Sequence, residues 1–322
     1  MASLFFFRTI RLLAGISLAL WLLPAGFAAE FEAKTKVEPK AGAETAATPS
    51  PAEQTLQELV ARQQELLAAL AKSDAPDFDQ EKIRTEMQQL CWDYDDLLKK
   101  TKGFAPAYAA YGMLLGKISM RRQSTIMFLK ANQLFGEEAK DGEATTPAFV
   151  RTWALVKNQL GNYLAEEGKP LEAMNYFLAA IDLTPNEPLY HYQLGRLLSE
   201  ARDDFIKSGQ WERLALSKSM HEAFRRAAEL APDRIEFTYR YAESFYELDP
   251  PDWDEALKMW AQLEEKAPTA VERETMRLHA AHVLIKQQKF DHARMLLSTV
   301  TEEPLQKQKE KLIAELPVEA AK

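Results

Sequence analysis

Histidine is the residue type in this chain best suited to hold a metal, and three histidines lie close together in the sequence. His279 and His282 are three residues apart, and His292 lies beyond the next expected turn. A zinc site needs three or four ligands in tetrahedral geometry. Because His279 and His282 are expected to point to different sides of their helix edge, we predict no metal site and no cofactor.

Neighbouring carboxylates are the next candidates, since paired acids can serve as general acid and base. Asp95-Asp96, Asp203-Asp204 and Glu264-Glu265 are adjacent in sequence, and consecutive helix residues do not face each other. The sequence also contains no glycine-rich phosphate loop, Gly-x-Ser-x-Gly elbow or His-Glu-x-x-His motif. The acids of Asp252–Glu255 are better interpreted as a helix start than as a calcium loop. We therefore predict no catalytic residue and no enzyme activity.

Composition narrows the class of protein further. The 322 residues include only 12 glycines and are dominated by strong helix formers, which predicts an all-α fold. The net charge is −8, and an acidic chain repels phosphate backbones, so we predict no nucleic-acid partner. Cys91 is the only cysteine, which rules out a disulfide within the chain.

The first residues have the pattern of an export signal. Arg8 and Arg11 precede an uncharged apolar run from Leu12 to Leu23, and Gly26 and Ala28 supply the small residues of a cleavage site. We predict a signal peptide over 1–28 and export, with the bacterial periplasm as the expected compartment. The alternative is an uncleaved segment that anchors the chain to the inner membrane; only then would the protein contact a membrane.

Residues 29–51 differ in composition from the remainder of the chain. Pro39, Pro49 and Pro51 are separated by Ala, Thr and Glu without apolar periodicity, which predicts a flexible linker. Apolar residues then recur at helical spacing over 52–72 and 79–101. We interpret 52–103 as an N-terminal helix pair, either a degenerate repeat or a cap.

A repeat of small and aromatic residues organises the rest of the chain. Phe177 follows Gly161 by sixteen residues, and Gly195 lies 34 residues after Gly161. The same sixteen residues separate Gly112 from Phe128. A period near 34 with small residues at fixed places is typical of stacked helix pairs, in which a glycine lets two helices cross closely. The further matching positions are Ala173, Ala180, Pro185, Phe224, Ala242, Trp260, Ala281 and Leu297.

These residues resemble the tetratricopeptide repeat (TPR) family, most clearly over 154–187. The resemblance implies a TPR-like α-solenoid, a right-handed superhelical stack of antiparallel helix pairs, over 104–303, with a capping helix and tail over 304–322. Two departures are expected to be insertions. About thirteen extra residues follow Gly195, which we interpret as a first helix prolonged through Ile206, a turn and a longer second helix, and 136–146 is expected to be an exposed loop.

The resemblance also implies where a partner would bind, because the first helices of the pairs line the concave groove of such a stack. Asn side chains can bond a peptide backbone with both donor and acceptor, and Tyr offers contact area with one polar tip. The groove positions carried over to this chain are Asn158, Asn162, Tyr192, Arg196, Tyr239, Glu243, Tyr246, His282 and Lys286.

The sequence supports three functional hypotheses. The first is a non-catalytic periplasmic scaffold that binds a peptide or partner protein in the groove, with a role in cell-envelope assembly. The second is an enzyme, or an enzyme's accessory domain, with a site in the 206–220 insertion. The third is a membrane-anchored structural adaptor. No part of the pattern selects an oligomeric state.

Overall fold

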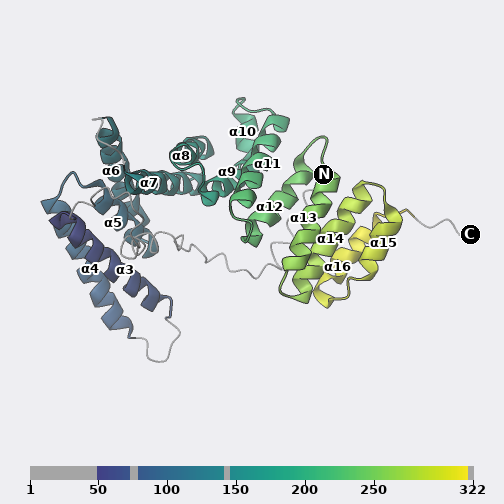
Figure 1. Ribbon diagram of the computed structural model, residues 1–322, viewed down its shortest axis with the longest axis horizontal. Coiled ribbons are helices and arrows are strands. Elements are labelled where there is room, and N and C mark those ends of the chain that lie inside the picture. Colours follow the sequence, from purple (N-terminus) through teal and green to yellow (C-terminus); the bar gives the residue numbers. More distant parts are fainter. Residues whose placement is uncertain (1–48, 73–78, 141–145, 318–322) are drawn as a thin grey trace, which may run out of the picture. The chain divides into compact units, whose positions relative to one another are not determined.

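A computed structural model of the chain describes residues 49–72, 79–140 and 146–317 (Figure 1). Every regular element within these ranges is a helix, which confirms the all-α prediction. The expected signal peptide, and the expected linker up to residue 48, lie outside the described residues. Among the helices that are described, none combines the length and apolar character needed to cross a membrane.

The chain divides into two compact units, residues 1–101 and 102–322. In the first unit, α3 (Pro51–Leu70) packs against α4 (Gln80–Lys100). The buried Tyr94 hydroxyl of α4 donates to Gln63 Oε1 of α3 at 2.8 Å, and Arg62 pairs with Asp93 at 2.6 Å. Ser50 and Glu53 form a capping box that starts α3.

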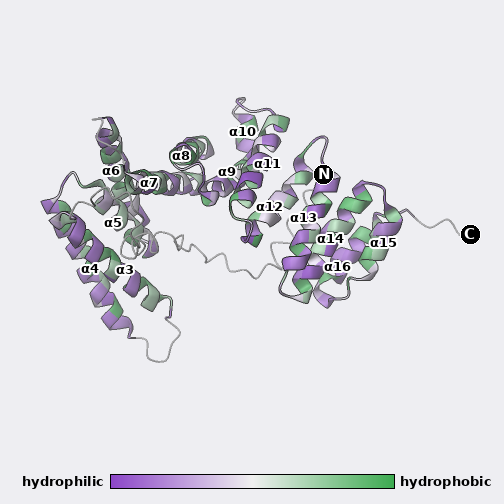
Figure 2. Ribbon diagram, viewed as in Figure 1, coloured by the Kyte–Doolittle hydropathy of each residue, from purple (hydrophilic) through white to green (hydrophobic). Residues whose placement is uncertain are grey.

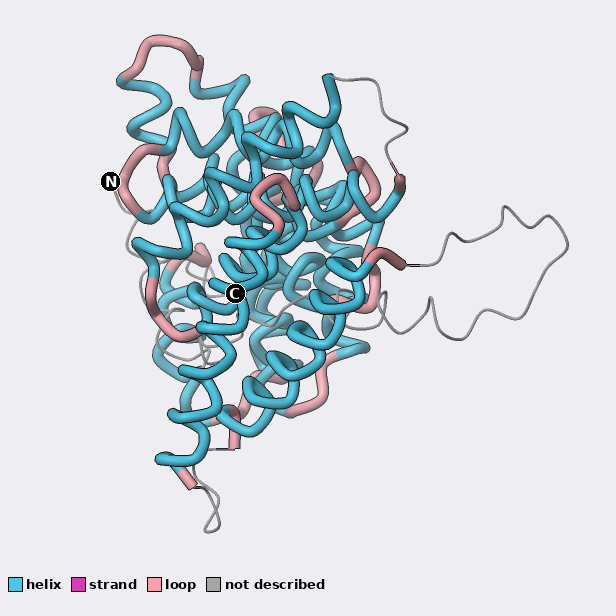
Figure 3. The backbone as a smooth tube through the Cα atoms, turned by 90° about the vertical axis from the view of Figure 1, so that its left-hand side faces the viewer, coloured by secondary structure: helices cyan, strands magenta, loops and turns pink. Residues whose placement is uncertain are grey.

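The second unit is a series of helix pairs joined by short loops (Figures 1 and 3). The pairs are α5/α6, α7/α8, α9/α11, α12/α13 and α14/α15, and the second helix of each pair packs against the first helix of the next. Figure 2 shows hydrophobic and hydrophilic residues interleaved along these helices, as amphipathic packing requires. The bounds are α5 Ala105–Lys117, α6 Arg121–Lys140, α7 Pro147–Glu166, α8 Pro170–Leu183, α9 Pro188–Glu200, α10 Arg202–Lys207, α11 Arg213–Leu230, α12 Ile235–Ser244, η1 Phe245–Glu247, α13 Trp253–Lys266, α14 Ala270–Lys286, α15 Phe290–Ser298, η2 Glu303–Leu305 and α16 Gln306–Ala314.

Glycines lie at the helix crossings of the first three pairs, as their spacing predicts. A Cβ on Gly161 would lie 2.8 Å from the ring of Phe177, and one on Gly195 would lie 2.8 Å from Phe224. Gly112 meets Phe128 in the same way, at 2.9 Å. Since real Cβ atoms do not approach other atoms this closely, only glycine fits these crossings without displacing the aromatic ring.

The helix boundaries follow local chemistry. Pro147, Pro170 and Pro188 each occupy the start of a helix, where the missing amide hydrogen costs nothing. The Asp252 side chain accepts from the Glu255 amide at 3.0 Å and caps α13, as expected for this acidic segment. Gly168 adopts φ of +73° in the tight turn between α7 and α8.

Both insertions differ from expectation. The first helix of the third pair does not continue through Ile206, because α9 ends at Glu200 and the backbone turns at Ala201 before the short α10. Phe205 of α10 is fully buried in the core formed by α8, α9 and α11, so burial of this ring holds the insertion in place. The acidic segment after Gly136 is helical as far as Lys140, and 141–145 lie outside the described residues.

Candidate partner-binding face

The nine residues expected to line a groove all lie on the first helices of the pairs or directly after one. We call the surface of α7, α9, α12 with η1, and α14 the first-helix face. Asn158 and Asn162 lie on α7, Tyr192 and Arg196 on α9, Tyr239 and Glu243 on α12, Tyr246 in η1, and His282 and Lys286 on α14.

The two asparagines of α7 are buried and do not form an open polar lining. Asn158 is 1 % exposed and Asn162 is 4 % exposed. Neither the amide nitrogen nor the carbonyl oxygen of the Asn158 side chain has a hydrogen-bond partner within the described part of the chain. A buried amide without partners costs about 1–3 kcal/mol. Asn158 therefore has an unused donor and an unused acceptor, but both lie beneath the surface and not in an open groove.

On α9, Tyr192, one of the two expected lining residues, packs into the core. The Tyr192 ring packs 4.7 Å from the Phe237 ring and 5.9 Å from the Phe224 ring, measured between centroids, and burial raises the pKa of Tyr192. Arg196 is more open, and its Nε lies 3.5 Å from Glu200 of the next turn.

An ion pair on α12, Arg240–Glu243, links this helix to α9. Of its two residues, only Glu243 is among the nine expected lining residues. Arg240 donates to Glu243 at 2.7 Å and to the Ser199 hydroxyl at 3.3 Å, and its guanidinium lies 5.0 Å from the centre of the Phe224 ring. Burial raises the pKa of Glu243. The three-residue spacing of Arg240 and Glu243 on one helix was the signal that could have found this pair.

Aromatic and histidine side chains form a cluster between α12, α13 and α14. The Tyr239 hydroxyl lies 3.0 Å from His279 Nε2, and the His279 ring stacks on Trp260 with centroids 4.2 Å apart and an interplanar angle of 8°. The Tyr246 hydroxyl donates to the His279 carbonyl oxygen at 3.1 Å. His282 stacks on Tyr246 at 5.1 Å.

Burial keeps both histidines of the cluster neutral. It lowers the pKa of His279 to about 3 and that of His282 to about 4. His292, the third histidine weighed as a ligand, lies exposed on α15. Among the described residues, no three His, Cys, Asp or Glu side chains are grouped so as to hold a metal ion.

Several cations along the first-helix face are paired with carboxylates of the same chain. Besides the Arg196 and Arg240 pairs, Arg202 at the start of α10 pairs with Glu247 of η1 at 2.6 Å, and Lys286 lies 3.7 Å from Glu315. Lys157 of α7 instead donates to Asn132 and lies 4.6 Å from the centre of the Trp153 ring.

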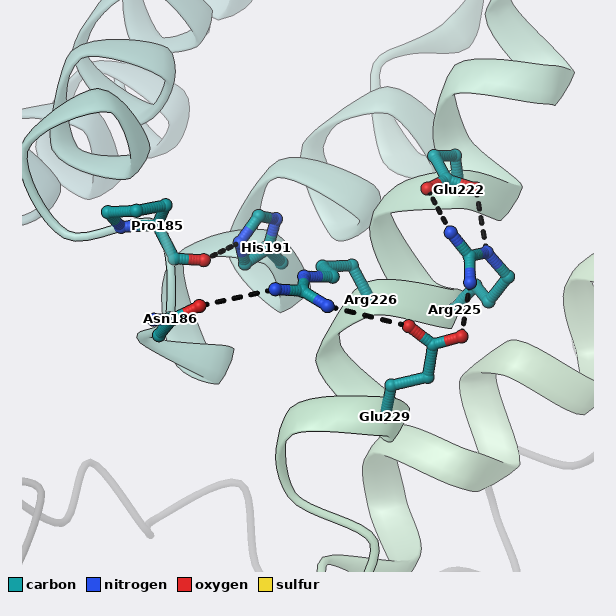
Figure 4. A network of polar contacts seen from close by, with 7 residues as sticks. All are labelled: Pro185, Asn186, His191, Glu222, Arg225, Arg226 and Glu229. Atoms are coloured by element: carbon teal, nitrogen blue, oxygen red, sulfur yellow. Dashed lines mark hydrogen bonds and ion pairs between the residues drawn. The ribbon is translucent and has the colours of Figure 1, made fainter.

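A second polar network lies on α11 and the turn before α9 (Figure 4). Arg225 binds both Glu222 and Glu229, and Arg226 donates to the Asn186 side chain at 3.2 Å. His191 Nε2 likewise lies 2.8 Å from the Pro185 carbonyl oxygen in this turn. The Arg226–Asn186 bond therefore ties α11 to the loop that connects α8 with α9, whereas the Arg225 pairs lie within α11.

His221, also on α11, is partly buried and contacts the next helix pair. Its Nδ1 lies 2.8 Å from the Ser244 hydroxyl, and its ring packs 4.6 Å from that of Phe245. Burial lowers the pKa of His221. This histidine therefore contributes to the packing between α11 and the helix pair that comes next.

Comparison with known proteins identifies the type of fold. No protein-family model and no curated protein matches the chain. Among solved structures, YrrB, described as a TPR protein with an unusual peptide-binding site, aligns with a TM-score of 0.51 and 18 % identity over 69 % of this chain and 97 % of that one. The fold is that of a TPR solenoid.

A second similar structure is PilF of Pseudomonas aeruginosa, with a TM-score of 0.51 and 14 % identity over 83 % of this chain and 100 % of PilF. Identities this low concern the fold alone. They confirm the predicted stack of antiparallel helix pairs, whereas any role of the nine first-helix residues depends on their own chemistry.

Proposed function

We propose that this TPR-like protein is a non-catalytic scaffold that binds an extended peptide segment of a partner protein on the first-helix face. The observation that carries the proposal is the buried, unpartnered amide of Asn158 on α7. A peptide backbone presents a donor and an acceptor at each residue, and it would satisfy both atoms of this side chain once Asn158, 1 % exposed without a partner, turns outward on binding. The aromatic side chains of α12, η1 and α14, which belong to later pairs of the same first-helix face, supply further contact area. The fold shared with the peptide-binding YrrB supports the same proposal.

The proposal includes the compartment in which the protein acts, the bacterial periplasm. The pattern of residues 1–28 supports export, and we propose that the mature protein acts in the bacterial periplasm, where it helps to assemble a cell-envelope complex. N-terminal sequencing of the protein recovered from a periplasmic fraction checks this, and an N-terminus at Ala29 is expected. Recovery of the intact N-terminus in the membrane fraction would favour the anchored adaptor.

The 206–220 insertion does not support an enzyme. Leu216 and Met220 belong to the buried core around Phe205, and Ser217 is buried on the same helix. The role that these contacts explain is packing between successive helix pairs, so we propose no catalytic function for this segment.

Replacement of Asn158 tests the binding face. In a pull-down of cell-envelope proteins followed by mass spectrometry, Asn158→Ala should lose the partner that the wild-type protein recovers, because the amide that bonds the backbone is gone. Asn175→Ala changes an exposed asparagine on the second helix α8 and should recover the partner normally. Thermal unfolding of both variants verifies that they fold. Equal recovery by a folded Asn158→Ala variant would contradict the proposal.

A further inference from the structure

The second helix of the first pair, α6, exposes a pair of large apolar side chains. Ile126 leaves 55 % of its surface exposed and Leu129 leaves 49 %. Because they are three residues apart, they lie next to each other on one face of the helix. Arg122 and Gln133 continue this face at its two ends, and both are exposed. We call these four residues the α6 stripe.

The other second helices of the stack carry polar residues at the equivalent positions, which are two before and one after the large side chain at the crossing. On α11 these positions are Glu222 and Arg225, which form an ion pair. On α13 they are Lys258 and Ala261, and on α8 the first of them is Asn175. No other helix among the described residues exposes two large hydrophobic side chains on one face. The apolar pair on α6 therefore indicates a surface that contacts something other than water.

The charges beside the α6 stripe are positive. Before Glu137, α6 contains three cations and no acid. Arg121 is paired with a carboxylate of α7. Within the part of the chain that the structure describes, Arg122 forms no ion pair, and Lys130 bonds only the uncharged side chain of Gln133, at 3.2 Å. The α6 stripe thus combines apolar contact area with two cations that no described carboxylate neutralises.

We propose that the α6 stripe binds an acidic amphipathic helix of a partner protein. Apolar residues at positions i, i+3, i+4 and i+7 of that helix would lie against Ile126 and Leu129, and flanking Glu or Asp would meet Arg122 and Lys130. The alkyl part of the Arg122 side chain adds to the apolar contact. Because α6 is a second helix, this surface is separate from the first-helix face, and the inference does not depend on the function proposed for that face.

Two other occupants of the α6 stripe match its charges less well. A two-fold contact between copies of this chain would bring Arg122 and Lys130 of both copies together. A surface of anionic lipid would attract the same cations, but it would repel the chain as a whole, whose net charge is −8. An acidic helix has neither disadvantage.

Two synthetic helical peptides test the charge assignment on the full-length protein. Both carry the same leucine stripe; one has glutamates on the flanks and the other has lysines. Fluorescence anisotropy should show saturable binding of the acidic peptide, and at least about tenfold weaker binding of the basic one. Equal affinity for the two peptides, or no binding of the acidic one, would overturn the proposal.

Variants locate the binding on α6. Ile126→Glu should weaken binding of the acidic peptide about tenfold or more, because it places a negative charge in the apolar contact. Leu178→Glu, at a residue 41 % exposed on α8, is the matched control and should bind normally. Arg122→Glu combined with Lys130→Glu should shift the preference toward the basic peptide, a gain that misfolding cannot produce. Unchanged binding by Ile126→Glu, or an unchanged preference in the double variant, would contradict the proposal.

The two other occupants are tested with the same variant. The wild type and Ile126→Glu should sediment equally with vesicles of phosphatidylglycerol, and sedimentation velocity should give both the same oligomeric state. Vesicle binding that Ile126→Glu abolishes would assign the α6 stripe to a lipid surface. A dimer that Ile126→Glu dissociates would assign it to a second copy of the chain. Either of these two results would overturn the proposal.

Discussion

The helix pairs of the stack differ in the residues that lie where their two helices cross. In α5/α6, α7/α8 and α9/α11, a glycine on the first helix faces a phenylalanine on the second. In α12/α13 and α14/α15, Ala242 and Ala281 take the glycine position, and Trp260 and Leu297 take the aromatic one. Between these two later pairs, the Tyr239 hydroxyl of α12 also lies 3.0 Å from His279 Nε2 of α14. The first three pairs thus depend on a glycine at each crossing, whereas the last two use an alanine there and have a polar contact inside an aromatic cluster between them.

The largest effect should come from adding bulk to a glycine crossing. Gly161→Val places a branched side chain where even a Cβ would lie 2.8 Å from Phe177, and overpacking of this kind costs about 2–3 kcal/mol. Denaturant unfolding should show this loss of stability. Gly103→Ala is the control, since an added Cβ there meets no atom within 4 Å. If Gly161→Val were as stable as the wild type, the helices would not be held together by this crossing.

Lowering the pH should destabilise the α12/α13 and α14/α15 pairs through the buried His279. Burial sets the pKa of His279 near 3 in the folded protein, below the value of about 6.5 in the unfolded chain. The unfolded state therefore binds more protons as the pH falls below about 6.5, and the free energy of unfolding falls until the pH reaches the folded pKa. We expect His279 to account for about 2 kcal/mol of lost stability between pH 6.5 and pH 4.5.

Comparison of the wild type with His279→Gln isolates this contribution, because carboxylates elsewhere titrate in both proteins. Unfolding curves measured at several pH values should show a smaller decline in stability for His279→Gln. His282 stacks on Tyr246 in the same cluster, and its pKa of about 4 adds to the decline in both proteins. Parallel pH dependences would mean that His279 does not remain uncharged and buried in the folded state.

The sequence predicted the stack because its signals are local and periodic. Gly161, Gly195 and Phe177 lie at fixed intervals, and each interval reflects one helix crossing. The break at Ala201 was not predicted, because the burial of Phe205 depends on a surface that other helices form. The interval likewise assigned Asn158 to a groove without revealing that neighbouring helices bury it. The spacing of residues gives the face of a helix, whereas exposure depends on what packs against that face.

The smallest effect should come from the α5/α6 crossing, which has both a glycine and a polar contact. Ser124 of α6 lies opposite Gly112 of α5, and its hydroxyl lies 2.7 Å from the Gly112 carbonyl oxygen and 2.9 Å from the Tyr163 hydroxyl. Ser124→Ala removes these contacts but keeps the size of the side chain, so it should cost about 1 kcal/mol.

A double-mutant cycle with Tyr163→Phe separates the two contacts of Ser124. Unfolding free energies should be less than additive if the hydroxyl pair stabilises the crossing, because either single variant already breaks the bond between α6 and α7. Full additivity would assign the effect to the Gly112 carbonyl alone. In that case the Ser124 hydroxyl would stabilise the α5/α6 crossing itself, and a hydroxyl bond between neighbouring pairs would not be needed to hold this part of the stack.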